Sequence, residues 1–114
     1  MKRFLTVIIM LAVPIIIFSA NAFADEGHCA EMKKQAQEAV DHGKAGHAGV
    51  LVEHAKSMLD HAKSCQKEGK ASGMDHLKEA IAQEEKAVDH GEAGHLDIAL
   101  KHAQDALMHA KQVK

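Results

Sequence analysis

Residues 38–64 read EAVDHGKAGHAGVLVEHAKSMLDHAKS, and residues 86–112 read KAVDHGEAGHLDIALKHAQDALMHAKQ. Fourteen of these 27 positions are identical, so one unit is used twice at an offset of 48 residues. Both stretches are dominated by residues with high helix propensity, and no proline follows Pro14. The pattern therefore predicts a repeated pair of helices and no strands.

Glycines indicate where these helices end. The segments 43–46 (GKAG) and 91–94 (GEAG) are typical of short helix–helix turns, and 69–73 (GKASG) is typical of a linker, with Ser72 as the expected N-cap of the next helix. Turns of a few residues force neighbouring helices to run antiparallel, so the expected fold class is all-α, an up-down-up-down four-helix bundle built from a duplicated helical hairpin. The predicted helices span roughly 26–42, 47–68, 73–90 and 95–112.

Apolar residues at steps of three and four define the expected core face of each helix. In the second helix these residues are Leu51, Ala55, Met58, Leu59, Ala62 and Cys65, and in the fourth they are Ile98, Ala99, Leu107 and Ala110. Charged runs such as 84–86 (EEK) are expected on the solvated surface, and the methionines are expected to fill the core. The core is small, so we expect marginal stability.

The first segment is typical of a secretory signal peptide. Lys2 and Arg3 precede an apolar stretch over 4–18, and residues 22–24 (AFA) form a small-x-small cleavage site. A retained membrane anchor is the alternative, but Pro14 interrupts the apolar stretch, which is shorter than the roughly 20 residues a span needs. We therefore predict cleavage of residues 1–24, export to the periplasm, and a mature domain over 25–114 with no membrane contact, made of repeat units 25–68 and 73–114.

Composition argues against several classes of function. Removing Lys2 and Arg3 leaves 12 lysines against 16 acidic residues, a net charge of −4, and the mature domain contains no arginine and no Phe, Tyr or Trp. Base stacking and bidentate phosphate binding are therefore both missing, which argues against a nucleic-acid partner. No pattern of an activated nucleophile is present, so we expect a protein that is not an enzyme.

Two cysteines, Cys29 and Cys65, remain in the predicted mature domain. In an oxidising compartment a disulfide is favoured over a reactive thiol pair, and neither residue belongs to a C-x-x-C or haem-attachment motif. The sequence leaves open whether the bridge forms within one chain or between two.

Ten histidines form the most informative pattern, because they fall into five pairs separated by 48 residues. The pairs are His28/His76, His42/His90, His47/His95, His54/His102 and His61/His109. A single histidine beside an apolar face is more often a polar flank than a ligand, but ten in duplicated register favour metal binding. A pH-responsive surface is the intermediate interpretation.

Histidines seven residues apart are about 10 Å apart along a helix, too far to share one ion. Each must therefore find a second ligand across the hairpin, where residues at one level have numbers with a constant sum. In the first repeat the facing pairs with a sum of 89, here called rungs, are His28/His61, His54/Gln35 and His42/His47; in the second, with a sum of 185, they are His76/His109, His102/Gln83 and His90/His95. The handedness of the bundle decides whether the histidine edges meet in the shared groove or turn away from it.

Carboxylates lie where further ligands are needed. Glu38 precedes His42 by one turn, Asp105 precedes His109, and Glu31 follows His28 by three residues. Mixed sites of two imidazoles with carboxylate or water suit Cu(II), Ni(II) or Zn(II). Bound haem is disfavoured, because the attachment motif and an aromatic pocket lining are missing.

The motif A-V-x-H-G-x-x-G-H, followed by heptad-spaced H-A-K in both repeats, resembles the small metal-binding protein family of bacterial periplasms. The match is best over 42–63 and 90–111. The resemblance implies a monomeric antiparallel four-helix bundle that binds several divalent ions, copper above all, for buffering or detoxification. It implies as candidate metal ligands His28, His42, His47, His54, His61, His76, His90, His95, His102 and His109.

This chain departs from the family pattern at Gln35 and Gln83, where members often carry histidine, so the middle rungs are expected to bind weakly. The cysteine pair is also an addition. Its numbers add up to 94 rather than 89, so an intramolecular bridge requires shifted helices or an asymmetric turn.

The leading hypothesis is a periplasmic protein that sequesters Cu(II), with Ni(II) and Zn(II) as alternatives. The competing hypothesis is a non-catalytic helical interaction module that senses envelope stress or acidity through its histidines.

Overall fold

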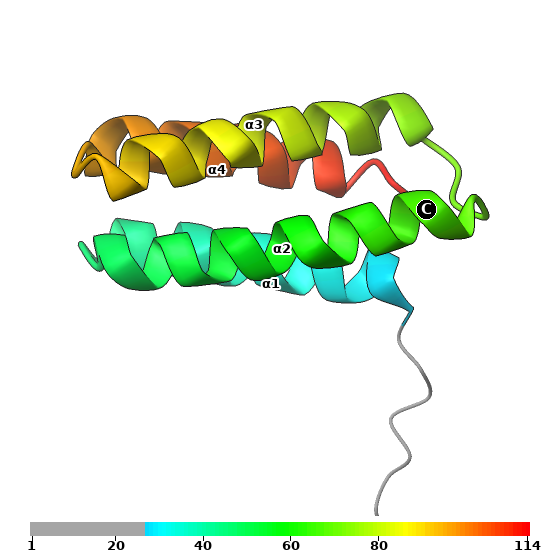
Figure 1. The fold of residues 1–114 in the computed structure, drawn as a ribbon, viewed down its shortest axis with the longest axis horizontal. Helices are drawn as coiled ribbons and strands as arrows, with labels where there is room; N and C mark the ends of the chain where they lie inside the picture. The colour runs from blue at the N-terminus through cyan, green and yellow to red at the C-terminus, as the bar shows by residue number, and fades with distance from the viewer. Residues whose placement is uncertain (1–26) are drawn as a thin grey trace, which may run out of the picture.

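A computed structural model describes residues 27–114, which form four helices and contain no strand (Figure 1). The helices are α1 (His28–Lys44), α2 (Ala48–Glu68), α3 (Met74–Glu92) and α4 (Leu96–Ala110). The prediction of an all-α fold with four helices is confirmed. The predicted signal peptide, residues 1–24, lies outside the described residues. Within residues 27–114, no helix combines the length and apolarity needed to cross a membrane.

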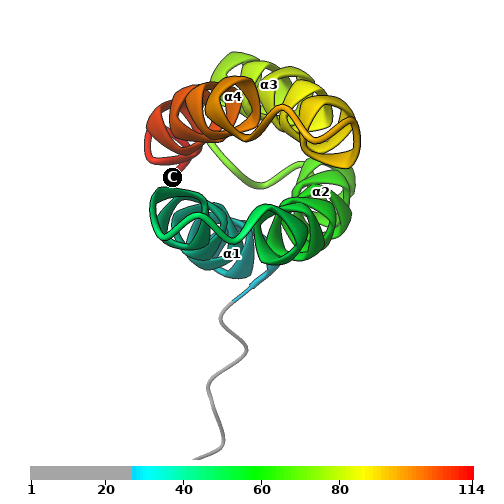
Figure 2. The same ribbon diagram turned by 90° about the vertical axis from the view of Figure 1, so that its left-hand side faces the viewer.

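The four helices pack in a ring around a core made of two clusters of buried side chains (Figure 2). Helix α1 contacts α2 and α4, and α3 contacts the same two neighbours. The chain reverses direction at each connection, so the α1–α2 and α3–α4 turns lie at one end of the bundle, and the α2–α3 linker lies at the other end with the C-terminus (Figure 1). We call these the turn end and the open end.

Each hairpin turn is closed by a glycine with positive φ. Gly46 (φ +84°) follows α1, and the His47 N–H donates to the His42 carbonyl across it at 2.9 Å. This is the Schellman arrangement, in which a left-handed glycine lets the last carbonyls of a helix find donors. The second hairpin repeats it at Gly94 (φ +80°). The turn thus ties together the backbones of the two histidines that flank it.

The first glycine of each turn motif was expected to break the helix, and that prediction is wrong. Gly43 and Gly91 lie inside α1 and α3, which continue to Lys44 and Glu92. A Cβ on Gly43 would lie 2.6 Å from a Leu51 methyl, and one on Gly91 would lie 2.5 Å from a Val52 methyl. These glycines therefore permit close helix packing, and the positive φ is confined to the second glycine.

The start of α3 also differs from the prediction. Its N-cap is Gly73 (φ +81°), and no side chain caps the helix. Ser72 instead pairs its backbone with Lys114, donating at 2.8 Å and accepting at 3.1 Å. This pairing fastens the end of the chain to the α2–α3 linker.

The core follows the predicted apolar faces with few exceptions. All six predicted core residues of α2 are buried, as are Ala99, Leu107 and Ala110 of α4. Ile98 and Met108 were expected inside but are 44% and 55% exposed. Much of the core is alanine, which explains how four helices approach closely around few large side chains.

Glu84 was expected on the solvated surface, and the structure contradicts this. Its side chain is fully buried, and neither carboxylate oxygen has a hydrogen-bond partner among the described residues. Burial raises the pKa of Glu84 to about 8, because the charged form is poorly solvated there. The physical reason is helical periodicity: Glu84 follows Leu77 and Ala80 on the core face of α3, at the position that Ala36 occupies in α1.

Cys29 and Cys65 form a disulfide within the chain, with their Cα atoms 4.9 Å apart. The bridge was expected to require shifted helices or an asymmetric turn, and the helices are shifted: residues at one level have numbers that add up to 94 rather than 89. Gly43 also approaches Leu51 (sum 94), and Gly91 approaches Ala99 at the matching sum of 190. The two Cα atoms of a histidine rung, whose numbers add up to 89, are therefore offset by about 7.5 Å along the helix axes. Imidazole side chains are long enough to bridge this offset.

Candidate metal centre

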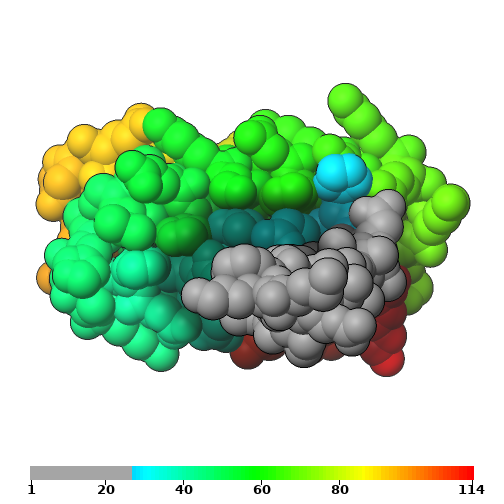
Figure 3. All heavy atoms as spheres, turned by 90° about the horizontal axis from the view of Figure 1, so that it is seen from below, coloured from blue at the N-terminus to red at the C-terminus, as the bar shows by residue number. Residues whose placement is uncertain are grey.

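The α1–α2 groove brings the predicted histidine edges together rather than apart. Figure 3 views the molecule onto this hairpin, with the start of α1 at the opposite end from the α1–α2 turn. At the open end the Nδ1 atoms of His28 and His61 lie 3.0 Å apart. The second hairpin repeats this contact between His76 and His109 at 3.1 Å. In each pair one Nδ1–H donates to the other Nδ1. When the donor ring carries its proton on Nε2 instead, both Nδ1 atoms can contact one ion placed beside them.

His28 also approaches a carboxylate on its other side. Its Nε2 atom lies 3.9 Å from Glu68 Oε1, and both side chains are close to half exposed. The open-end pair is therefore accessible to solvent and has a negative charge next to it. An ion can reach the pair without any opening of the core.

The middle of the first hairpin holds His54 in one orientation. Its Nδ1 atom lies 2.8 Å from Gln35 Oε1 and 3.0 Å from Glu38 Oε2. Gln35 in turn donates from Nε2 to Glu31 at 2.9 Å, and this bond is the main cause of a lowered pKa of Glu31. Both neighbours of Nδ1 are acceptors, so His54 carries its proton there and leaves Nε2 free to bind a metal.

The middle of the second hairpin keeps the glutamine but not the carboxylate. His102 Nδ1 lies 2.9 Å from Gln83 Oε1, whereas Lys86 stands at the position of Glu38. The pKa of His102 is lowered, first by partial desolvation and then by the positive charges of His90 and Lys86, with Asp105 opposing them. The two middle rungs therefore match in geometry and differ in charge.

At the turn end the remaining histidines stack beside the middle ones. The His42 ring lies 5.8 Å from that of His47 and stacks on that of His54 at 5.1 Å. In the second hairpin the matching distances, from His90 to His95 and to His102, are 5.9 and 5.5 Å. Each turn end thus gathers three imidazoles, and all ten predicted histidines take part in ring pairs.

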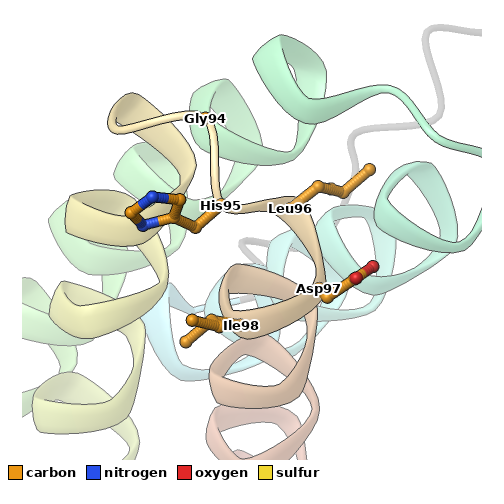
Figure 4. Close-up of a pocket in the computed structure, with 5 residues that line it drawn as sticks. All are labelled: Gly94, His95, Leu96, Asp97 and Ile98. Carbon is orange, nitrogen blue, oxygen red and sulfur yellow. The ribbon is translucent and has the colours of Figure 1, made fainter.

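A shallow surface pocket of about 380 Å³ lies at the α3–α4 turn (Figure 4). Its lining residues are Gly94, His95, Leu96, Asp97 and Ile98. In Figure 4 the His95 ring points toward α3, which carries His90, so this ring is shared between the pocket and the turn-end cluster. The exposed Ile98 belongs to this pocket.

Across residues 27–114, no three side chains of His, Cys, Asp or Glu converge closely enough to hold an ion as they stand. A rung by itself offers two imidazoles, so an ion bound there would need water or a small ring rotation to supply its other ligands. The sulfur atoms of Cys29 and Cys65 are joined to each other, so they provide no thiolate. The available donor set is imidazole nitrogen, carboxylate and water.

A comparison with family models gives the general role of the chain. The model of the small metal-binding protein family matches residues 1–113 of the chain. The chain belongs to this family. A search of curated proteins finds no match to the chain. Membership supports metal binding as its general role and is typical of a binding protein rather than an enzyme.

The glutamines have a role that the sequence pattern did not predict. Gln35 and Gln83 were expected only to weaken the middle rungs, but each accepts a hydrogen bond from the histidine facing it. Their place in the rungs was visible in the sequence. An acceptor opposite a histidine orients that histidine's ring, and this was the signal available.

Proposed function

We propose that the protein sequesters several Cu(II) ions in the periplasm, as a buffer against free copper, with Ni(II) and Zn(II) as weaker alternatives. The observation that carries this proposal is the Nδ1–Nδ1 separation of 3.0 and 3.1 Å at the two open-end rungs. Bonds of about 2.0–2.1 Å to both nitrogens give an angle of roughly 95° at the ion. That angle suits two neighbouring ligands in a tetragonal plane, the geometry typical of Cu(II) and Ni(II), better than a tetrahedral Zn(II) site.

The two ends of each hairpin offer separate binding positions. The open end supplies His28 with His61, and its repeat supplies His76 with His109. The turn end supplies three histidines in each hairpin, with Nε2 of the middle histidine directed by its glutamine. These candidate sites imply four ions for the whole bundle.

We further propose that the fold is an antiparallel up-down-up-down bundle derived from duplication of one hairpin. The 48-residue offset of all ten histidines and the near-equal ring distances in the two halves support this origin. Export by residues 1–24 would place the protein in an oxidising compartment, and the Cys29–Cys65 disulfide is consistent with that location. No other subunit is needed to complete a rung, which supports a monomer.

Metal release in acid follows from the same ligands. Imidazole binds an ion only in its neutral form, so protons and Cu(II) compete for every candidate site. We expect binding at pH 7.5 and steep loss below about pH 6. This behaviour suits a store that gives up its ions when the compartment acidifies.

The test is a titration of metal-free, disulfide-bonded protein with Cu(II) at pH 7.5, followed by calorimetry and electron paramagnetic resonance. We expect saturable uptake near four equivalents, with nitrogen hyperfine structure from imidazole. Absence of heat and a spectrum of hydrated Cu(II) would exclude the proposal.

A pH-sensing interaction module is the second candidate, and one observation favours it. His28 and His61 touch through nitrogen atoms, so protonating both rings brings two cations together and would open the groove. Thermal melts with and without Cu(II) discriminate the two functions. A sensor responds to pH alone, whereas a copper store also melts at higher temperature when Cu(II) is present.

A further inference from the structure

The two turn ends differ in one charged position beside their stacked histidines. In the first hairpin Glu38 Oε2 lies 3.0 Å from Nδ1 of His54, whose ring stacks on that of His42. The exposed fractions of these contacting side chains are 38% for Glu38 and 26% for His54, so the carboxylate is held close to the rings and is partly shielded from solvent. A cation bound here gains a negative neighbour.

The second hairpin has the opposite charge at the same place. Lys86 replaces Glu38 one turn before His90, while the stacking of His90 on His102 is preserved. Asp105, whose counterpart is Ser57, is the carboxylate nearest in sequence to His102. Among the described residues, neither a hydrogen bond nor an ion pair joins Asp105 to a histidine. A cation bound here gains an ammonium neighbour and no positioned carboxylate.

From this difference we propose that the first turn-end Cu(II) ion binds the Glu38–His42–His54 cluster of the first hairpin, and that the Lys86–His90–His102 cluster fills later. The proposal rests on the proposed Cu(II) binding and names the order in which its sites fill. Glu38 acts as a positioning residue: its carboxylate lies against Nδ1 of His54, whose N–H Gln35 accepts, so Nε2 faces away toward the ion. It also adds negative charge beside the rings.

The order can be measured with Cu(II) itself as the probe, because the paramagnetic ion broadens the ring-proton signals of nearby histidines. Protein over residues 25–114, the proposed mature form, receives about a tenth of an equivalent of Cu(II) at pH 7.5. We expect the His42 and His54 signals to broaden before those of His90 and His102. Equal broadening at the two turn ends, or earlier broadening at the second, would overturn the proposal.

Charge exchange supplies the decisive variants. Glu38→Lys should weaken turn-end Cu(II) binding in the first hairpin by about 10- to 100-fold, the usual effect of losing a partner of a metal-bound histidine. Lys86→Glu should strengthen Cu(II) binding in the second hairpin, so that the histidine signals of both turn ends broaden together. Glu38→Gln keeps an acceptor oxygen beside His54 and removes the charge. Its Cu(II) affinity at the first turn end should therefore lie between those of wild type and Glu38→Lys.

Both exchanged residues are solvent-accessible helix positions, and the circular dichroism of the variants checks that they remain folded. The open-end signals of His28 and His61 serve as an internal control, since neither exchange touches them. An unchanged filling order in Glu38→Lys overturns the proposal while leaving Cu(II) binding intact. Absence of broadening at every histidine of the wild type instead excludes the proposed function.

Discussion

The two hairpins place five histidines each in nearly the same arrangement but support them differently. The first hairpin has a disulfide between Cys29 and Cys65, where the second has the buried pair Leu77 and Val113. The open-end nitrogens nevertheless lie 3.0 and 3.1 Å apart. The disulfide is therefore not what positions the imidazoles; the helix register shared by both copies is sufficient.

The largest expected effect comes from removing the disulfide. Cys29→Ala with Cys65→Ala frees a loop closed at a sequence separation of 36 and should lower the free energy of unfolding by about 4 kcal/mol. Cys29→Leu with Cys65→Val installs the side chains of the second hairpin and should recover part of this loss through apolar burial. Denaturant titrations of both variants measure the difference.

The Cu(II) affinity of the His28–His61 pair is a second test of what the disulfide does. It should survive in the Leu/Val variant, because His76 and His109 meet without a disulfide. Loss of open-end binding in that folded variant would show that the disulfide does position the ligands.

The next effect concerns the core position that is Ala36 in α1 and Glu84 in α3. The folded pKa of Glu84 is about 8 against an ordinary value of 4.5, so the folded state holds a proton that the unfolded state releases. The contribution of the Glu84 carboxyl group to the free energy of unfolding is most favourable below pH 4.5, and it is lost as the pH rises towards 8. Glu84→Met should therefore stabilise the protein by about 3 kcal/mol at pH 7.

Urea unfolding at pH 5 and pH 8 checks this prediction. The advantage of Glu84→Met over wild type should grow between the two pH values, and Ala36→Glu should destabilise the first hairpin in the same manner. A pH-independent difference between Glu84→Met and wild type would contradict a buried carboxyl that titrates.

A smaller effect separates the two packing glycines. An added methyl at Gly91 meets the stiff, branched Val52, whereas one at Gly43 meets the flexible ends of Leu51 and Leu100. Overpacking should outweigh the gain in helix propensity at Gly91, so Gly91→Ala costs about 1–2 kcal/mol. Gly43→Ala should change stability by less than about 1 kcal/mol. Equal melting temperatures for the two variants would argue against this packing account.

The smallest effect concerns the glutamines of the middle rungs. In Gln35→Ala, His54 still has the Glu38 carboxylate 3.0 Å from Nδ1, whereas in Gln83→Ala, His102 loses the acceptor that holds it. We expect a loss of about 1 kcal/mol for Gln83→Ala and roughly half that for Gln35→Ala. Thermal melts at pH 7.5 compare them, and a larger loss for Gln35→Ala would contradict the hydrogen-bond arrangement.

The sequence predicted the helices and the rungs because both depend on periodicity. Helix propensity, short turns and the core face of α2 needed no tertiary information, and index sums paired His28 with His61 correctly. The side of the groove on which the rings meet depends on the handedness of the bundle, which no local pattern encodes. Metal ligation by the ten histidines stays a prediction.

Other features depend on packing that a single helix does not reveal. Gly43 was interpreted as a helix end because the motif contains two glycines, and only close contact with Leu51 shows which one closes the turn. The register of the two helices was predicted from the sum of the histidine numbers. The cysteine numbers indicate the register better, because short side chains meet only when their Cα atoms lie at the same level. Glu84 was assigned to the surface by its charge, against the spacing of Leu77 and Ala80.

We propose that the imidazoles gathered at each of the two ends of a hairpin hold one Cu(II) ion. Positions 28 and 42 are 14 residues apart on α1, so ions at the two ends should be separated by about 20 Å. Pulsed electron paramagnetic resonance can measure this Cu(II)–Cu(II) distance in a variant whose five second-hairpin histidines are replaced by glutamine. We expect a narrow distance distribution near 20 Å, with imidazole nitrogen bound to both ions. A structureless distribution, or Cu(II) without nitrogen ligands, would contradict binding at the two ends.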